Sequence, residues 1–340
     1  MHASKRILVT GGAGYVGAHC CKAFSEAGWE VFVFDNLSRG WRDFVQWGPL
    51  VQGDILDRDA LQQAMEAIQP SAVAHFAALA YVGESVLEPD RYFRTNVTGT
   101  MNILDAMKSH DVRQMVFSST CATYGEPQYL PIDEAHPQVP INPYGRSKLM
   151  AEELLRDYSE AFGIRSVSLR YFNAAGADPD GTIGERHEPE THLIPLALEG
   201  AGNPDFCLSI FGDNYDTRDG TAIRDYIHVC DLADAHLKAL EYLSRGGATA
   251  AFNLGTGTGT SVQEIWQSVQ RTTARSVERR VSERRPGDPA SLVANANKAR
   301  QLLGWKARRS SIDAIIADAW NWHTAEMVRR NEVAISLGAD

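Results

Sequence analysis

The chain has 340 residues, which is enough for one large α/β domain or two unequal ones. Its hydrophobic content of 44% and charged content of 22% are ordinary for a globular protein. The formal net charge of −10, with no long basic block, argues against a nucleic-acid or anionic-membrane partner. An anionic ligand would therefore have to be bound by a few local arginines or by backbone amides.

The cysteines and the N-terminus predict the cellular compartment. The chain has five cysteines, an odd number, and they lack the paired spacing of a zinc site. They are Cys20, Cys21, Cys121, Cys207 and Cys230. The first residues lead directly into a strand without a signal peptide, and no later stretch is long and apolar enough to span a bilayer. We expect a reduced, cytoplasmic protein.

The first elements have the pattern strand, glycine turn, helix, strand, acid. The apolar run 7–10 stops at the turn Gly11–Gly17, a helix continues to about Ala27, and the strand 31–34 ends in Asp35. Glycines let the chain turn tightly and let a pyrophosphate approach the N–H groups of the helix. The acid lies 18 residues after the last glycine, where a carboxylate binds the adenosine ribose, and it favours NAD over NADP.

Strands and helices continue to alternate as far as residue 171. We expect strands at 50–52, 72–76, 115–120 and 166–169, and helices near 58–67, near 90–108 (a helix containing Asn96) and after Pro143. This alternation predicts a Rossmann-type, doubly wound α/β fold with a parallel sheet. Ligands of such sheets bind at the carboxyl ends of the strands. Seven noteworthy residues fall at predicted strand ends: Asp35, Asp54, Phe76, Ala77, Ala78, Thr120 and Tyr171.

Tyr144 and Lys148 stand four residues apart on a predicted helix, so their side chains share one face. An ammonium group beside a phenol favours the phenolate. A phenol whose pKa approaches neutrality can act as a general acid or base on a sugar or alcohol hydroxyl.

The regular alternation of strands and helices stops after residue 176, and we expect a smaller mixed α/β portion there. Residues 176–191 read as a long loop, which is followed by helices at 193–198, 231–242, 262–271, 297–303 and 311–323 and by strands at 206–211 and 251–254. We predict an NAD-binding domain at 1–175, to which segments near 225–255 return, and a mainly substrate-binding domain at 176–330. Gly255–Gly259 is interpreted as a turn and helix cap rather than as a second phosphate loop, and the basic run 279–285 as a solvated stretch.

Three further groups are assigned structural or no special roles. His187 and His192 lie near Glu185, Glu188 and Glu190 without fixed spacing, so no metal site is expected. His75 on an apolar strand and Cys121 are expected to pack, and Trp320 and Trp322 to form core or subunit contacts.

Several ordered segments together resemble one family. They are VTGGAGYVGAH, VFDNLS, GDILD, HFAALAYVGESV, FSSTCATYG, INPYGRSK, LRYFNAAGAD, FGDNYDTRDGTAIRDYIHVCDLADAH, FNLGTGTG and RRPGD. The chain resembles the extended short-chain dehydrogenase/reductase superfamily and, within it, the UDP-glucose (UDP-galactose) 4-epimerases. The resemblance covers nearly the whole chain.

The resemblance implies a role for each matching residue. Tyr144 would be the acid/base, Lys148 would lower its pKa and hold the nicotinamide ribose, and Thr120 would bind the reacting sugar hydroxyl. The positions that would contact NAD are Gly11, Gly14, Tyr15, Val16, Asp35, Asn36, Leu37, Asp54, Ile55, Phe76, Ala77, Ala78, Asn96, Tyr144, Lys148 and Tyr171. Those that would contact the UDP-sugar are Thr120, Asn173, His192, Phe211, Arg224, Arg285, Asp288 and Leu292.

The implied reaction is a transient oxidation with tightly bound NAD. The phenolate removes the proton of the C4 hydroxyl while hydride leaves C4, and the 4-keto sugar rotates and takes the hydride back on its other face. The result is inversion at C4 without net redox change. The family also suggests a homodimer.

Departures from the family pattern leave the choice of sugar open. Ala80 stands where many of these epimerases carry a lysine beside the cofactor, and His192 where asparagine commonly contacts the substrate. Leu292 is intermediate in size at a position that gates the 2-substituent of the sugar, so UDP-GlcNAc is an alternative substrate. Two segments also resemble UDP-xylose/UDP-arabinose 4-epimerases.

Rival functions on the same fold are disfavoured by specific residues. A 4,6-dehydratase would carry Asp-Glu directly after Thr120, where this chain has Cys121 and Ala122. Asp35 argues against an NADP-dependent reductase. A non-catalytic dinucleotide-binding protein would be expected to lack the tyrosine or the lysine, and both are present.

Overall fold

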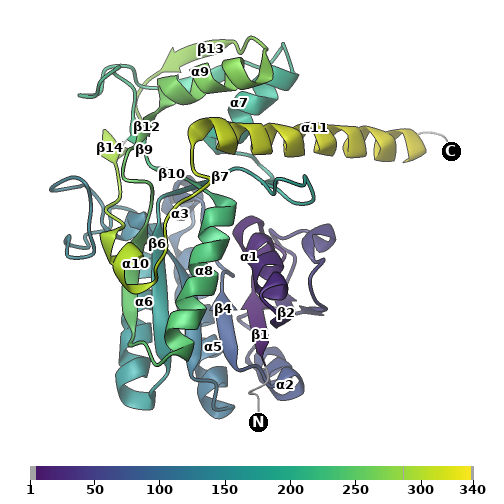
Figure 1. Cartoon of the computed structure of the whole chain (residues 1–340), viewed down its shortest axis with the longest axis vertical. Helices are drawn as coiled ribbons and strands as arrows, with labels where there is room; N and C mark the ends of the chain where they lie inside the picture. The colour runs from purple at the N-terminus through teal and green to yellow at the C-terminus, as the bar shows by residue number, and fades with distance from the viewer. Residues whose placement is uncertain (1–4, 286, 338–340) are drawn as a thin grey trace.

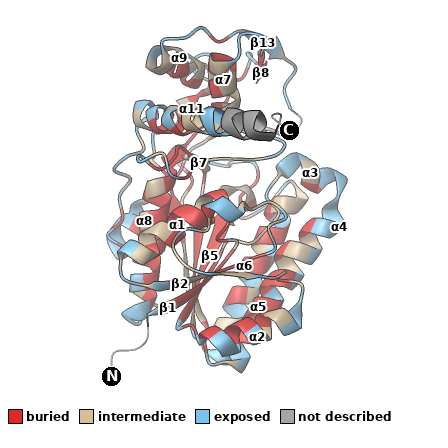
Figure 2. Ribbon diagram, turned by 90° about the vertical axis from the view of Figure 1, so that its right-hand side faces the viewer, coloured by how far each residue is buried: buried red, intermediate tan, exposed pale blue. Residues whose placement is uncertain are grey.

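A seven-stranded parallel sheet forms the centre of the computed structural model, which describes residues 5–285 and 287–337. Its strand order is β11-β6-β5-β4-β1-β2-β3. The strands are β1 (Arg6–Thr10), β2 (Glu30–Asp35), β3 (Leu50–Gln52), β4 (Ala72–His75), β5 (Gln114–Thr120), β6 (Arg165–Tyr171) and β11 (Ala250–Leu254). Their apolar runs are buried because helices cover both faces of the sheet (Figures 1 and 2).

Two hydrophobic clusters join the helices to the two faces. On one face, α1 (Tyr15–Glu26) and α8 (Val229–Ser244) pack through Phe24, Leu232 and Leu240. The helices on the other face are α2 (Arg58–Ile68), α5 (Gly99–Ser109) and α6 (Pro143–Phe162). The predicted doubly wound α/β fold is confirmed.

The helix predicted near 90–108 is not continuous. After α3 (Val82–Leu87) and α4 (Pro89–Tyr92), a π-helical turn covers Phe93–Thr98 and leads into α5. The turn contains buried Asn96, whose side chain hydrogen-bonds both backbone groups of Leu79 and donates to Ser147 Oγ at 2.9 Å. These polar bonds tie the turn to the cleft and to α6, which the apolar pattern could not reveal.

The remaining residues form a smaller α/β portion above the carboxyl ends of the main sheet (Figure 1). Its helices α7 (Leu193–Gly202), α9 (Val262–Thr273) and α11 (Ile312–Leu337) share a third apolar core. Its strands are β7 (Asn173–Ala175), β8 (Leu208–Phe211), β9 (Ile223–Arg224), β10 (Tyr226–His228), β12 (Thr260–Ser261), β13 (Arg279–Ser282) and β14 (Ser291–Leu292). They pair as β10-β7, β12-β9-β14 and β13-β8.

Two interpretations of this portion are decided by hydrogen bonds. The basic run 279–285 is not only a solvated stretch, because β13 pairs in parallel with β8 while most of its side chains stay exposed. The glycine-rich turn at 255–259 is a turn and cap as predicted: Thr256 and Gly257 donate their amides to Asp225, and Ser261 and Glu264 form a capping box on α9.

The C-terminal segments pack onto the rest of the chain. α10 (Asn297–Leu302) covers the β11 side of the sheet. Trp322 is buried against Phe44, as predicted for a core residue, and Trp320 packs against the third core. None of the described helices combines the length and the apolar character that crossing a bilayer requires.

Candidate active site

Two positions of the glycine turn after β1 have no room for a side chain. Gly11 has φ +76°, and a Cβ there would lie 2.4 Å from the backbone nitrogen of Ala77. A Cβ on Gly17 would lie 2.2 Å from the Gly11 carbonyl oxygen. Gly14 occupies the N-cap of α1 in an extended conformation. The first amides of α1 therefore face a concave backbone surface suited to an anion.

An open cleft follows the carboxyl ends of β1, β2 and β4. Ten predicted cofactor-binding residues line it: Gly11, Gly14, Tyr15, Asp35, Asn36, Asp54, Ile55, Phe76, Ala77 and Ala78. Ala80, expected beside the cofactor, also lines it. The lining further includes residues that the sequence did not single out for this role: Phe34, Ser38, Arg39, Gly40, Gly53, Leu79, Tyr81, Glu84, Arg91, Thr95 and His187. Most of the latter come from loops or from α3 and α4, where no regular pattern marks them.

The cleft fits NAD by the chemistry of its donors and acceptors. Asp35 ends β2, and its carboxylate accepts the amides of Ala13 at 3.1 Å and Leu37 at 2.8 Å. Asp54 accepts from the side chain of Asn36 at 2.9 Å and from the amide of Leu56. Fixed carboxylates can accept hydroxyl protons of an adenosine ribose, while the glycine turn offers N–H groups to a pyrophosphate. Burial raises the pKa of Asp35 above its ordinary value.

Six predicted cofactor residues do not line this cleft in the structure. Val16 packs against the sheet core, and Leu37 contributes its amide to Asp35. Asn96 is engaged with Leu79 and Ser147, as described above. Tyr171 shares a 2.6 Å hydrogen bond with Ser118. Tyr144 and Lys148 stand at the neighbouring end of β5.

Helix α6 brings Tyr144 and Lys148 to the end of β5. Its first turn is capped by Asn142, which accepts the amide of Gly145 at 2.8 Å. Gly145 packs so closely on the loop after Thr120 that a Cβ would lie 2.3 Å from the carbonyl oxygen of Ala122. The glycine between the tyrosine and the lysine is thus what lets the helix approach β5.

The three predicted catalytic residues meet there. Lys148 is 3% exposed and donates to the carbonyl oxygen of Ser118, at the end of β5, at 2.9 Å. Thr120 ends the same strand, and its hydroxyl is near enough to Tyr144 to act to lower the pKa of the phenol. The ring of Tyr92 stands edge-on to that of Tyr144, with centroids 6.4 Å apart.

Burial dominates the titration of this group. It raises the pKa of Tyr144 above its ordinary value, and the nearby Tyr171 raises it further. Burial also lowers the pKa of Lys148 to about 7. The expected lowering of the Tyr144 pKa by Lys148 is therefore not observed, because removing both groups from water disfavours both charged forms.

A buried network that the sequence did not single out supports α6. Glu152 and Arg170 form an ion pair at 2.5 Å, and Ser119 donates to Glu152. Arg170 also donates to the hydroxyl of Tyr124 at 2.9 Å. Glu152 stands one turn beyond Lys148, a spacing that could have suggested its place on the inward face.

Predicted substrate residues gather on the short strands above the sheet. Arg224 on β9 pairs with Asp288, and Leu292 on β14 stands beside Arg224 in the parallel pairing. The guanidinium of Arg285 lies 4.0 Å from the ring centroid of Phe211. Sequence reasoning also missed Asp225, whose backbone oxygen accepts the amide of Asn173 at 3.0 Å.

Cys121 connects this set to the catalytic residues. It follows Thr120 directly, and the positive charge of Arg224 acts to lower its pKa. Burial is the larger effect and raises the pKa of the Cys121 thiol to about 12, so the residue packs, as predicted. Cys121 and Leu292 lie against one small apolar cluster that contains Tyr124 and Phe172.

Two further histidines have partners of their own. His192, predicted to contact the substrate, is the N-cap residue of α7, and its imidazole contacts Glu185. His75 is buried between Thr10 and Thr100, at 2.8 Å and 3.0 Å, as expected of a core histidine.

Comparison with known proteins agrees with this geometry. The profile of the "NAD dependent epimerase/dehydratase family" matches residues 7–255. The chain belongs to this family. It is 51% identical to a UDP-glucose 4-epimerase of Rhizobium meliloti over 97% of this chain and 99% of the relative, which places it among the UDP-glucose 4-epimerases.

Solved structures of this group share the fold. The UDP-glucose 4-epimerase from Brucella ovis in complex with NAD is 52% identical, with a TM-score of 0.91 over 93% of this chain and 97% of that chain. The enzyme from Stenotrophomonas maltophila with bound NAD and formylated UDP-arabinopyranose is 38% identical, with a TM-score of 0.92 over 95% and 99%.

Proposed function

We propose that this chain inverts C4 of UDP-glucose and UDP-galactose with NAD as its cofactor. The observation that carries the proposal is the placement of Tyr144, Lys148 and Thr120. They meet at the end of β5, close to the cleft formed by the glycine turn, and Cys121 connects them to Arg224 and Leu292. A hydroxyl-bearing carbon of a nucleotide-linked sugar can then meet an acid/base and a cofactor at one place.

Each of the three catalytic residues either transfers a proton or positions a reacting group. Tyr144 removes and returns the proton of the C4 hydroxyl, and Thr120 holds that hydroxyl through its own. Lys148, fixed on the Ser118 carbonyl, holds a ribose hydroxyl of the cofactor and the orientation of Tyr144. NAD supplies a reversible acceptor for the electrons of C4 and, in its oxidised form, a positive charge, which lowers the pKa of a nearby phenol.

The cofactor residues divide by chemistry. The glycine turn and the first amides of α1 bind the pyrophosphate, and Asp35 and Asp54 bind the adenosine end. Phe76, Ala77 and Ala78 form the floor of the cleft at the end of β4. We infer that the remaining predicted contacts, including Val16, Leu37, Asn96 and Tyr171, shape the cleft from behind.

The UDP-sugar is bound by the smaller α/β portion, beyond the carboxyl ends of the main sheet. Arg224 and Arg285 provide local positive charge for the diphosphate in a chain whose formal net charge is −10. Phe211, Asp288, Asn173 and Leu292 complete the set. We assign the NAD-binding portion to residues 1–175 with the segments near 225–255, and the mainly substrate-binding portion to 176–330.

Assembly and location follow the family expectation. We infer a homodimer, and the half-exposed Met101 on α5 and Met150 on α6 offer apolar surface for it. A cytoplasmic location is consistent with five free cysteines.

A comparison of substrates tests the proposal. The purified chain, without added reductant, is given UDP-galactose, UDP-GalNAc and UDP-arabinopyranose side by side, and products are separated by chromatography. We expect UDP-galactose to be converted fastest. Faster turnover of the pentose or of the N-acetylhexosamine would shift the assignment to those alternatives, and no turnover of any sugar by NAD-loaded protein would reject the function.

A further inference from the structure

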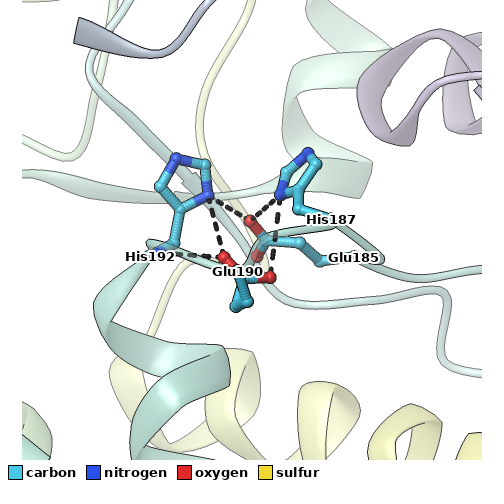
Figure 3. Close-up of side chains that lie close together, drawn as sticks. All are labelled: Glu185, His187, Glu190 and His192. Carbon is cyan, nitrogen blue, oxygen red and sulfur yellow. Dashed lines mark hydrogen bonds and ion pairs between the residues drawn. The ribbon is translucent and has the colours of Figure 1, made fainter. Parts of the chain in front are cut away.

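Four side chains of the long loop between β7 and α7 converge on one point. They are Glu185, His187, Glu190 and His192, and one ligand atom from each lies within 4.8 Å of the others (Figure 3). Two carboxylates and two imidazoles at one place form a donor set that divalent cations bind.

The distances in this cluster are those of a small coordination shell. His187 Nδ1 lies 3.2 Å from Glu185 and 3.7 Å from Glu190. His192 Nδ1 contacts the same Glu185 oxygen and lies 3.9 Å from Glu190. Donors about 2.1 Å from a tetrahedral zinc ion are about 3.4 Å apart, close to these three separations. The His192–Glu185 contact is a shorter hydrogen bond, which would have to lengthen when a cation binds. Figure 3 shows both rings turning their Nδ1 atoms toward the two carboxylates.

Charge and burial distinguish the cluster from a solvated set of ion pairs. Glu185 has a 6% exposed side chain, those of His187 and Glu190 are 19% and 21% exposed, and His192, at 49%, forms the open side of the cluster. In the absence of a cation the two carboxylates pair with the two imidazoles. A divalent cation would displace the imidazole protons and balance the two carboxylate charges itself.

The backbone of the loop is held in place by contacts outside the cluster. Trp322 Nε1 donates to the Glu185 carbonyl oxygen at 3.0 Å, and Trp41 Nε1 donates to that of Arg186 at 2.9 Å. One oxygen of Glu190 accepts the amides of Thr191 and His192 at 2.7 Å and 2.8 Å. These bonds orient ligands from behind, as supporting hydrogen bonds do in metal sites.

We propose that Glu185, His187, Glu190 and His192 bind one divalent cation, with zinc as the best match, in a closed structural site. Four protein ligands complete a tetrahedron and leave no position for substrate, which is the mark of structural rather than catalytic zinc. The proposal reverses the expectation, from irregular spacing in the sequence, that no metal binds here. It also assigns His192 to the cation instead of to the sugar.

The site would fasten the loop beside the cofactor cleft. The His187 ring meets the rings of Tyr15 and Tyr81 edge-on, with centroids 6.3 Å and 5.8 Å apart, and all three residues line the cleft. A cation at His187 and His192 would thus join this wall of the cleft to the start of α7.

Metal titration of the full-length protein tests the proposal. The protein is treated with a chelator, dialysed, and titrated with Zn²⁺ in competition with a chromophoric chelator, in the absence of any sugar nucleotide. We expect one tight equivalent per chain and a rise in the thermal unfolding midpoint on binding. X-ray absorption at the zinc edge should show nitrogen and oxygen ligands only, with scattering from two imidazoles.

Matched variants locate the site. Glu185→Gln and His187→Gln should each weaken zinc binding by about 100-fold or more, whereas Glu188→Gln, an acid-to-amide change in the same loop, should bind as the wild type does. Absence of a tight equivalent in the wild type, or a spectrum without two imidazoles, would overturn the proposal even if the variants fail to fold. Binding equal to wild type in folded Glu185→Gln would overturn it as well. Because no step measures epimerisation, failure of the proposed function would leave this result interpretable.

Discussion

The cofactor cleft and the substrate set are built by different means. The cleft and the neighbouring catalytic residues use the ends of the central parallel strands, so Asp35 and Thr120 are positioned by backbone pairing and Ala77 by its amide bond to the Thr10 carbonyl oxygen. The substrate set stands on strands of two to four residues and is held by side-chain pairs between distant parts of the sequence, such as Arg224 with Asp288 and Arg285 with Phe211. A single substitution leaves the backbone hydrogen bonds of a strand in place, whereas it removes a contact that depends on the side chain itself. Variants in the two regions should therefore fail in different ways.

The largest effect is expected where the two regions meet. Tyr144→Phe removes the proton acceptor but keeps the ring, so turnover should fall about 1000-fold while NAD and UDP still bind. Turnover is measured with saturating UDP-galactose, and binding by calorimetry. The exposed Tyr129→Phe serves as control and should keep its activity. Near-normal turnover of Tyr144→Phe would reject the assigned acid/base.

A smaller and more selective loss is expected above the sheet. Arg224→Gln breaks the pair with Asp288 and removes a cation assigned to the diphosphate. A charged hydrogen bond contributes about 1.5 to 3 kcal/mol, so the KM for UDP-galactose should rise roughly 30-fold with NAD content unchanged. Arg218→Gln, which removes an exposed pair with Glu264, is the matched control. Loss of NAD from Arg224→Gln would contradict the division between the two regions.

The third effect leaves the site intact and concerns the stability of the sheet itself. Burial lowers the pKa of His75 to about 3, and the charge of Lys148 lowers it as well. The folded chain therefore keeps this imidazole neutral while the unfolded chain binds a proton below about pH 6.5, so stability is complete above that pH and falls as the pH drops.

At pH 5 this single group should cost roughly 2 kcal/mol of unfolding free energy. Thr10 and Thr100 face the ring and are uncharged. In His75→Gln, urea unfolding at pH 7 and pH 5 should show a loss on acidification that is smaller than in the wild type by that amount. An unchanged difference between the two pH values would show that His75 is already charged in the folded chain.

The sequence was most informative where one local signal determines the structure. The glycine turn, the acid at the end of β2 and the strand-helix alternation depend on neighbours within a few residues, and the sheet and ten cleft residues follow from them. The spacing of Tyr144 and Lys148 was equally informative because one helix contains both.

Other features depend on partners that are distant in the chain. The π-helical turn at Asn96 requires Leu79 and Ser147, and Asp225 is engaged by Thr256, Gly257 and Ala294. The raised pKa of Tyr144 reflects burial, which no residue spacing reveals. The convergence of Glu185 with His192 depends on the path of a loop without periodicity.

The pairing of the late strand β11 with β6 has a practical consequence for truncated proteins. Ala250–Leu254 pairs with Val167–Tyr171 along most of the length of that strand. A truncated protein that stops at residue 175 would leave the backbone donors and acceptors of the largely buried strand β6 without this neighbour, and an unpaired strand edge can pair with other copies of the chain. Residues 1–175 should therefore aggregate when they are expressed alone. A fragment that stays in solution has to retain Ala250–Leu254, the strand that pairs with this edge.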